Sequence, residues 1–273
     1  MIPAKFDYVE AASADEAVAL LGRHGDDAKL LAGGHSLLPL MKLRLASPSV
    51  LIDIGRVRDL SYVRDGGDHL AIGAATRHRD VETSALVIAA APLLAHVAGQ
   101  VGDPQVRHRG TLGGSLAHGD PASDLPAAAL ALGATFVARG PGGERAIPAE
   151  RFFQGFLETA LAPDELLVEV RVPKHAGAPW AWQKFTRRAQ DWAIVGVAAV
   201  RNGSARVALV NMGPTPQRAL AVEEALAGGA TGLDAAARAA EGATPPSDLN
   251  GDADYRSHLA RVLVGRALAT MGV

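Results

Sequence analysis

The sequence contains no cysteine among its 273 residues. This absence excludes disulfide bonds, thiolate catalysis, cysteine-based zinc sites and iron–sulfur clusters ligated by this chain. It also fits a reducing compartment, so we expect the protein to be cytoplasmic.

Long apolar runs and an excess of charge of either sign are missing too. No stretch reaches the roughly 20 apolar residues that cross a bilayer, and the N-terminus has no signal-like apolar segment. The 27 basic and 29 acidic residues give a formal net charge of −2, without the basic excess of nucleic-acid-binding domains. We therefore expect a soluble protein that neither inserts into a membrane nor binds nucleic acid.

Motifs of hydrolytic or metal-dependent catalysis are also absent. The 9 histidines show no His-Glu-x-x-His spacing, and no Walker lysine motif occurs. Residues 34–38 do not form a Gly-x-Ser-x-Gly nucleophile elbow, because Leu38 stands where that motif needs glycine. We name no catalytic residue and no metal ligand.

The composition is that of an ordinary globular chain, 48% hydrophobic and 21% charged, and its length suits two domains. Capping residues and apolar spacing predict a β-α-β lobe over residues 1–58. Its expected elements are a helix begun by Ser13 and Glu16, a strand at 29–32, a helix at 36–45 and a strand at 50–54. We expect an α+β protein with this lobe at its N-terminus.

A second lobe is expected over residues 59–176, which makes residues 1–176 one two-lobed domain. Its expected elements are strands at 70–74, 135–138 and 166–172, helices at 93–101 and 121–132, and a glycine-rich, aperiodic stretch at 101–120. Residues 177–273 are expected to form a smaller domain. Its expected elements are a three-stranded meander at 181–185, 194–200 and 205–210, and helices at 219–226, 233–240 and 255–269.

The first candidate binding segment is a glycine pair between a predicted strand and a predicted helix. It reads Leu30-Leu31-Ala32-Gly33-Gly34-His35-Ser36-Leu37. Glycine lets the backbone approach a ligand closely, and the N–H donors at a helix start suit a pyrophosphate. Ser36 is expected to add a hydroxyl donor or to cap the helix. The alternative is a tight turn that binds nothing.

A second glycine pair lies in the aperiodic stretch. It reads Thr111-Leu112-Gly113-Gly114-Ser115. Consecutive N–H groups in such a loop can form an anion-binding concavity. Asp124 follows, and it either accepts hydrogen bonds from ribose hydroxyls or a ring N–H, or caps a helix. Two such loops favour a dinucleotide, whose long polar middle needs donors from more than one side.

Lys184 and Trp192 are candidates for contact with a planar cofactor ring, which needs a polar handle and an aromatic neighbour. Aromatic residues make up only 4% of the chain. The alternative for Trp192, at the start of a strand, is a packing role.

The two glycine loops together resemble the paired FAD-binding loops of the flavoprotein subunits of molybdenum hydroxylases, of the carbon monoxide dehydrogenase and xanthine dehydrogenase type. The resemblance extends over essentially the whole chain. It includes Phe6-Asp7-Tyr8, Phe153-Gln154-Gly155-Phe156 and Gly213-Pro214-Thr215-Pro216-Gln217-Arg218.

The resemblance implies a two-lobed FAD-binding fold of the vanillyl-alcohol oxidase (PCMH) type and a C-terminal domain with a three-stranded sheet. It implies that residues 30–37 and 111–115 hold the pyrophosphate of non-covalent FAD, with Asp124 near the ribityl or adenosine groups. Leu161 and Lys184 match positions near the isoalloxazine ring. Trp192 stands where a smaller aromatic is expected.

The resemblance further implies an electron relay. Iron–sulfur clusters of a small partner subunit would reduce the FAD, which would pass electrons to an external acceptor. The molybdenum cofactor would reside on a large partner subunit, within a dimer of heterotrimers. Two alternatives are a stand-alone oxidase of the same fold, with FAD attached covalently through His35, and a scaffolding subunit that has lost its flavin.

Overall fold

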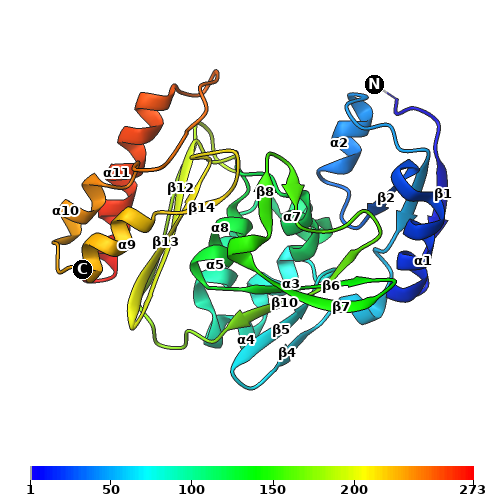
Figure 1. The fold of residues 1–273 in the computed structure, drawn as a ribbon, viewed down its shortest axis with the longest axis horizontal. Helices are drawn as coiled ribbons and strands as arrows, with labels where there is room; N and C mark the ends of the chain where they lie inside the picture. The colour runs from blue at the N-terminus through cyan, green and yellow to red at the C-terminus, as the bar shows by residue number, and fades with distance from the viewer. Residues whose placement is uncertain (1) are drawn as a thin grey trace.

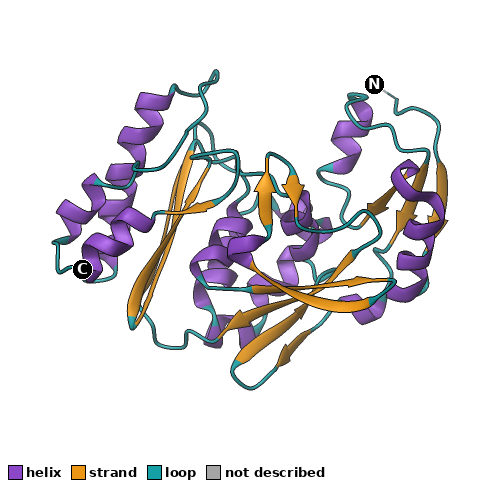
Figure 2. Ribbon diagram, viewed as in Figure 1, coloured by secondary structure: helices purple, strands orange, loops and turns teal. Residues whose placement is uncertain are grey.

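The computed structural model describes residues 2–273, and its elements form three successive groups, each built on its own β-sheet (Figures 1 and 2). The groups follow one another along the molecule in chain order (Figure 1). The α+β class expected from the sequence is confirmed. No helix within residues 2–273 combines the length and the apolarity needed to cross a bilayer.

The first group is a three-stranded parallel sheet with the order β1-β3-β2. Its elements are β1 (Asp7–Glu10), α1 (Ala14–His24), β2 (Ala28–Leu31), α2 (Leu37–Lys42) and β3 (Val50–Asp53). The predicted cap is present, since the Ser13 hydroxyl accepts the Glu16 N–H at 3.1 Å. Helix α2 ends three residues earlier than expected, before Arg44 adopts a left-handed backbone with φ 58°.

The second group is a five-stranded antiparallel sheet with the order β4-β5-β10-β6-β7. Its strands are β4 (Val63–Asp65), β5 (His69–Gly73), β6 (Thr135–Gly140), β7 (Gly143–Pro148) and β10 (Leu166–Pro173), with a small hairpin of β8 (Phe153–Gly155) and β9 (Glu158–Thr159). Its helices are α3 (His78–Thr83), α4 (Ala85–Ala90), α5 (Pro92–Gly99), α6 (Pro104–Arg109), α7 (Leu112–His118) and α8 (Asp124–Ala131).

Helices α6 and α7 occupy the stretch that we expected to be aperiodic. The Asp103 carboxylate accepts the Val106 N–H at 2.8 Å and starts α6, and the Thr111 hydroxyl accepts the Gly114 N–H at 3.1 Å and starts α7. Caps and packing therefore overcome the low helix propensity of the glycines here. The second glycine pair lies inside a short helix rather than in an open loop.

The third group is a sheet with the order β11-β12-β13-β14, backed by three helices. The elements are β11 (Trp180–Phe185), β12 (Val195–Asn202), β13 (Ser204–Val210), β14 (Gln217–Arg218), α9 (Leu220–Ala227), α10 (Gly232–Ala237) and α11 (Ala253–Thr270). The expected meander of three strands is present. The sheet has a fourth strand that we did not expect, because the chain turns back after β13 and adds two residues to its edge.

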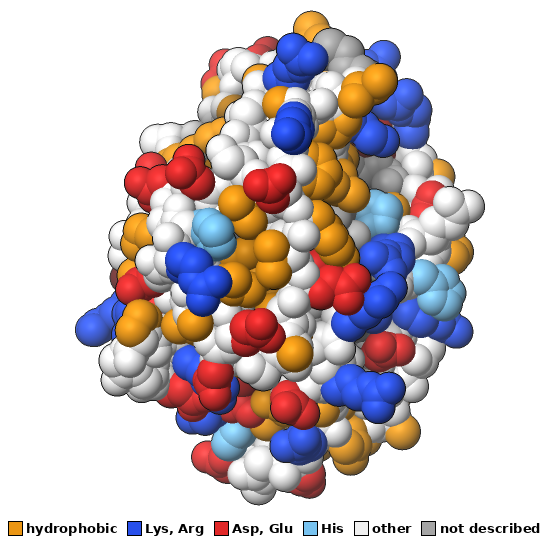
Figure 3. Space-filling model, turned by 90° about the vertical axis from the view of Figure 1, so that its right-hand side faces the viewer, with side chains coloured by type: hydrophobic (Ala, Val, Ile, Leu, Met, Phe, Trp, Pro, Cys, Tyr) orange, Lys and Arg blue, Asp and Glu red, His pale blue; other side chains and the backbone are white. Residues whose placement is uncertain are grey.

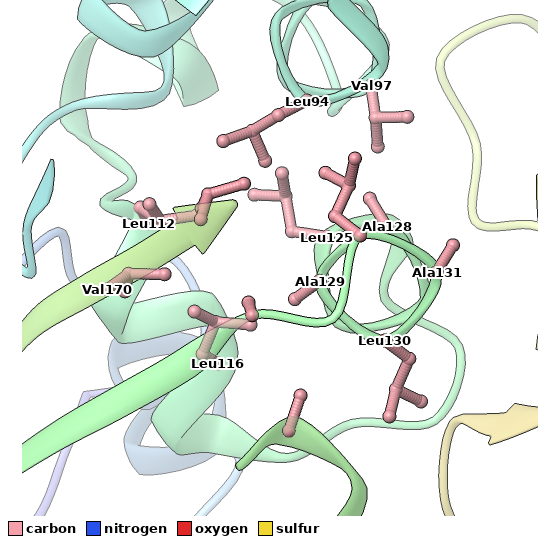
Figure 4. Close-up of a cluster of buried hydrophobic side chains, with 14 of the residues drawn as sticks. Leu94, Val97, Leu112, Leu116, Leu125, Ala128, Ala129, Leu130, Ala131 and Val170 are labelled. Carbon is pink, nitrogen blue, oxygen red and sulfur yellow. The ribbon is translucent and has the colours of Figure 1, made fainter. Parts of the chain in front are cut away.

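Strand β12 is buried on both faces and joins the third group to the second. Ala198 and Val200 belong to the same core as α8, whereas Val197 and Ala199 belong to the core with α11. Figure 4 shows side chains of α8 packed among Leu94, Val97, Leu112 and Leu116. This continuous packing positions β11 against α5, and β12 and β13 against α8.

Arg256 on α11 is fully buried and anchors the start of β12. Its guanidinium donates to the Ile194 carbonyl and, at 2.8 Å, to the Asp248 carboxylate. We expect Arg256→Ala to lower the free energy of unfolding by at least about 2 kcal/mol, because a carbonyl left without its donor and a cavity both destabilise the fold.

Chemical denaturation of this variant and of Arg261→Ala, which changes an exposed arginine on the same helix, measures the effect. Equal stability of the two variants would contradict this role of Arg256.

Candidate functional site

The two glycine segments lie directly against each other, although about 80 residues separate them in the chain. A Cβ atom at Gly33 would overlap the Arg109 carbonyl oxygen and lie 2.7 Å from the Gly110 Cα. A Cβ at Gly114 would lie 3.9 Å from the Ala32 side chain. Gly33 is therefore required for close approach of the two backbones, and the structure brings both predicted loops into one site.

The first loop offers unused backbone donors. Within residues 2–273, the N–H groups of residues 33–37 donate to no protein acceptor, although all of these residues except His35 are partly buried. Gly34 has a φ of 80°, which turns the chain before α2. Ser36 precedes α2 without a capping hydrogen bond from its side chain, so its hydroxyl is also available. Five consecutive donors and a hydroxyl suit an anionic group.

The second segment uses its N–H groups within the protein. Leu112 and Gly113 donate to the Thr76 and Ala74 carbonyls at 2.9 and 2.8 Å, and Gly114 donates to the Thr111 hydroxyl. The open nest that we expected there is therefore not formed by these three groups. Ser115 is partly exposed and follows Gly114, which lies near Ala32 of the first loop. The second segment mainly provides a packing surface for the first loop.

Strand β2 ends at Leu31, shortly before the glycine pair, and so fixes the position of the first loop. Leu30 packs on the core of the N-terminal group, and the Leu31 carbonyl accepts the Ile54 N–H at 2.9 Å. His35 is exposed. Figure 3, which looks onto the N-terminal group, shows Lys and Arg side chains gathered with histidines beside a hollow in this face.

Asp124 and Lys184 form a buried ion pair between α8 and β11. The Lys184 Nζ donates to the Asp124 Oδ2 at 2.7 Å, and the two side chains are only 12% and 6% exposed. The other carboxylate oxygen, Oδ1, is buried without a partner among the described residues. Burial raises the pKa of Asp124 to about 6, although Lys184 lowers it. Ser123 is the capping residue of α8 and Asp124 makes no capping bond, so the capping alternative for Asp124 is wrong.

Leu161 and Trp192 lie in different surroundings. Leu161 is partly buried against the core of the second group. Trp192 is 56% exposed on the segment between β11 and β12, so the packing alternative for it is wrong.

Sequence reasoning missed Arg77 and His78, which precede and begin α3. Arg77 donates to the carbonyls of Arg109 and Gly55, and His78 packs against Gly110, where a Cβ would lie 2.7 Å from the imidazole. Neither residue belongs to a motif. Only the tertiary structure shows that both contact the segment behind the first loop.

His78 is buried, and its Nδ1 has no partner among residues 2–273. Burial, followed by the charges of His35, Arg77 and Arg107, lowers the pKa of His78 to about 4. The imidazole is therefore neutral at physiological pH, and its protonation would place a positive charge among arginines.

Comparison with known proteins gives matches over both parts of the chain. Residues 4–175 match the family described as the FAD binding domain in molybdopterin dehydrogenase, and residues 180–271 match the CO dehydrogenase flavoprotein C-terminal domain. The carbon monoxide dehydrogenase medium chain of Hydrogenophaga pseudoflava is 47% identical over 279 residues, covering 98% of this chain and 97% of that protein.

Two further likenesses extend over the whole chain. The 6-hydroxypseudooxynicotine dehydrogenase complex subunit alpha of Paenarthrobacter nicotinovorans is 40% identical over 281 residues, covering 98% of this chain and 95% of that protein. The solved structure of carbon monoxide dehydrogenase from Hydrogenophaga pseudoflava matches with a TM-score of 0.96 and 48% identity, over 100% of this chain and 99% of the matched chain.

The fold and these matches define an FAD-binding flavoprotein of the oxidoreductase class. The chain belongs to the FAD-binding flavoprotein family of the molybdopterin dehydrogenases. The resemblance, the fold type and the FAD cofactor that we inferred from the paired glycine motifs are thereby confirmed. The individual contact residues remain predictions.

The depressed pKa of His78 makes stability pH-dependent with a defined sign. Above pH 6.5 the residue is neutral in both states; as pH falls from 6.5 toward 4 only the unfolded chain gains the proton, so stability is lost. This shift corresponds to roughly 3 kcal/mol. The raised pKa of Asp124 acts in the opposite direction over a similar range.

We expect His78→Gln to lose less stability between pH 7 and pH 4.5 than the parent protein, by about 2 kcal/mol. Asp124 is common to both proteins, so their difference isolates His78. Urea denaturation at the two pH values measures it, with His258→Gln as the exposed control. Identical pH dependence in the parent and His78→Gln would show that His78 is not the titrating group.

Proposed function

We propose that this chain is the electron-transfer subunit of a molybdenum hydroxylase complex and binds FAD non-covalently between its glycine segments. The observation that carries the proposal is the run of five unused N–H donors at residues 33–37, next to a wall formed by the second segment. A pyrophosphate needs such a set of converging donors.

The residues of the first loop fit that cofactor. The N–H groups of residues 33–37 and the Ser36 hydroxyl would donate to the pyrophosphate oxygens, and Gly33 would leave room between the two backbones. The second segment would contribute Thr111, Gly113, Gly114 and Ser115, of which Ser115 has a partly exposed side chain. Leu30, Leu31, Ala32 and Leu37 would position the loop at the end of β2.

The buried pair would hold the polar groups further along the cofactor. Asp124 Oδ1 has an unfilled acceptor position and would take a hydrogen bond from a ribityl or adenosine hydroxyl. Lys184 favours the charged form of Asp124 by its bond to Oδ2 and would present its remaining donors to the ring. Leu161 would provide apolar contact with the isoalloxazine, and Trp192 would cover it from the solvent side.

When bound, FAD supplies the redox chemistry, which is the transfer of electrons from iron–sulfur clusters to an external acceptor. The chain has no cysteine with which to ligate a cluster. We therefore assign the clusters to a small partner subunit and the molybdenum cofactor to a large one, in a dimer of heterotrimers. Relatives of this chain carry names with different substrates, carbon monoxide and 6-hydroxypseudooxynicotine. We infer that substrate choice resides in the large subunit.

The visible spectrum of the purified chain, followed by acid precipitation, tests the cofactor assignment. Flavin bands whose colour moves to the supernatant support non-covalent FAD. Colour that stays in the pellet would indicate attachment through a residue such as His35 and a stand-alone oxidase. Lack of flavin binding by the assembled complex, even with added FAD, would leave the scaffolding role.

We expect Gly33→Ala to reduce FAD affinity by more than about tenfold, a cost above 1.4 kcal/mol, because the new methyl overlaps the Arg109 carbonyl and forces the segments apart. Gly22→Ala is the matched control, since a Cβ there meets nothing within 4 Å. Flavin fluorescence titration measures both affinities, and circular dichroism checks the fold. Normal FAD affinity of Gly33→Ala would contradict the assigned loop.

A further inference from the structure

The first glycine loop is enclosed between two backbone segments. On one side, a Cβ at Gly33 would overlap the Arg109 carbonyl oxygen. On the other side, a Cβ at Gly55 would lie 3.2 Å from the Ala32 carbonyl oxygen. The distance between Gly55 and Arg109 therefore limits the space available to the backbone of Ala32 and Gly33.

One side chain connects these two segments. The Arg77 Nη2 donates to the Gly55 carbonyl at 3.1 Å, and its Nη1 donates to the Arg109 carbonyl. Arg77 lies between β5 and α3. Backbone hydrogen bonds connect the residues around Arg77 to the second glycine segment and to Gly110, which precedes it. The His78 N–H donates to the Gly110 carbonyl at 3.0 Å, and the Leu112 N–H donates to the Thr76 carbonyl at 2.9 Å.

The guanidinium group is suited to this position. It is planar and carries several donors in a fixed arrangement, so it can hold two carbonyl oxygens at a set separation. Arg77 is half-buried, and it donates to backbone carbonyls rather than to a carboxylate. Its positive charge therefore also contributes to the field around the first loop.

We propose that Arg77 is a positioning residue for FAD, which holds Gly55 and Arg109 at the separation that presents the N–H groups of residues 33–37 to the pyrophosphate. Arg77 acts through these two carbonyls and without itself contacting the cofactor. This inference rests on the proposed location of FAD at the first loop.

The test compares Arg77→Ala, Arg77→Lys and Arg56→Ala in the full chain. Arg56 follows Gly55, its side chain is 81% exposed, and its one hydrogen bond among the described residues is to Glu10. Arg56→Ala therefore removes the same charge but leaves the hydrogen bonds from Arg77 to the Gly55 and Arg109 carbonyls in place. We expect Arg77→Ala to weaken FAD binding by about 10- to 100-fold, the range seen when supporting hydrogen bonds are removed around metal ligands. Arg56→Ala should lie within about threefold of the parent protein, because an exposed charge is screened.

Two further readouts separate positioning from general stability. Arg77→Lys keeps the charge but lacks the planar guanidinium whose two nitrogens bond the two carbonyls, so it should bind FAD with intermediate affinity. Millimolar guanidinium should restore FAD binding to Arg77→Ala, whereas methylammonium should not. In hydrogen exchange of the FAD-bound proteins, the peptide covering residues 30–38 should lose protection in Arg77→Ala and keep it in Arg56→Ala.

The outcomes are distinguishable from failure of the proposed function. If the parent chain binds no FAD, the location of the cofactor is wrong. If the parent binds FAD and Arg77→Ala binds it as tightly as Arg56→Ala, the positioning role is wrong. If Arg77→Ala fails to fold, Arg77→Lys decides, and affinity equal to that of the parent protein would overturn the inference.

Discussion

The contact between Gly33 and the Arg109 carbonyl is the constraint on which the candidate site depends. It joins a loop of the parallel N-terminal sheet to a segment of the antiparallel second group, and it leaves no space for a side chain. Because the backbones touch directly, a shift of either segment changes the spacing of the donors at residues 33–37. The neighbouring residues, Arg77 above all, can be understood as supports of this one contact.

The two glycine segments have different physical roles despite their similar sequences. The first leaves its N–H groups unpaired, in a turn that Gly34 makes with a positive φ. In the second, the N–H groups donate to the Ala74 and Thr76 carbonyls and to the Thr111 hydroxyl that caps α7. Glycine therefore serves ligand approach in the first segment and close helix packing in the second.

The remainder of the site depends on how the C-terminal sheet packs. Strand β12 is buried on both faces, which seats its neighbour β11 beside α8 and brings Lys184 to Asp124. A buried carboxylate with one paired and one unpaired oxygen is costly in isolation. A cofactor hydroxyl that donates to Asp124 Oδ1 would give this unpaired oxygen a hydrogen bond. Binding of the proposed cofactor would therefore remove the desolvation cost that the free chain carries at Asp124.

The sequence by itself determined the local elements and the class of ligand. Ser13 and Glu16 define the first helix, alternating apolar residues define the strands, and the paired glycine motifs indicated FAD through a resemblance that holds over the whole chain. Only the tertiary structure decided which donors are free, because the N–H groups of the second glycine pair donate within the protein and those of the first pair do not. It also decided that α6 and α7 are helical, that a fourth strand edges the last sheet, and that Arg77 bridges two carbonyls. These features depend on contacts between residues distant in the chain, which no local pattern encodes.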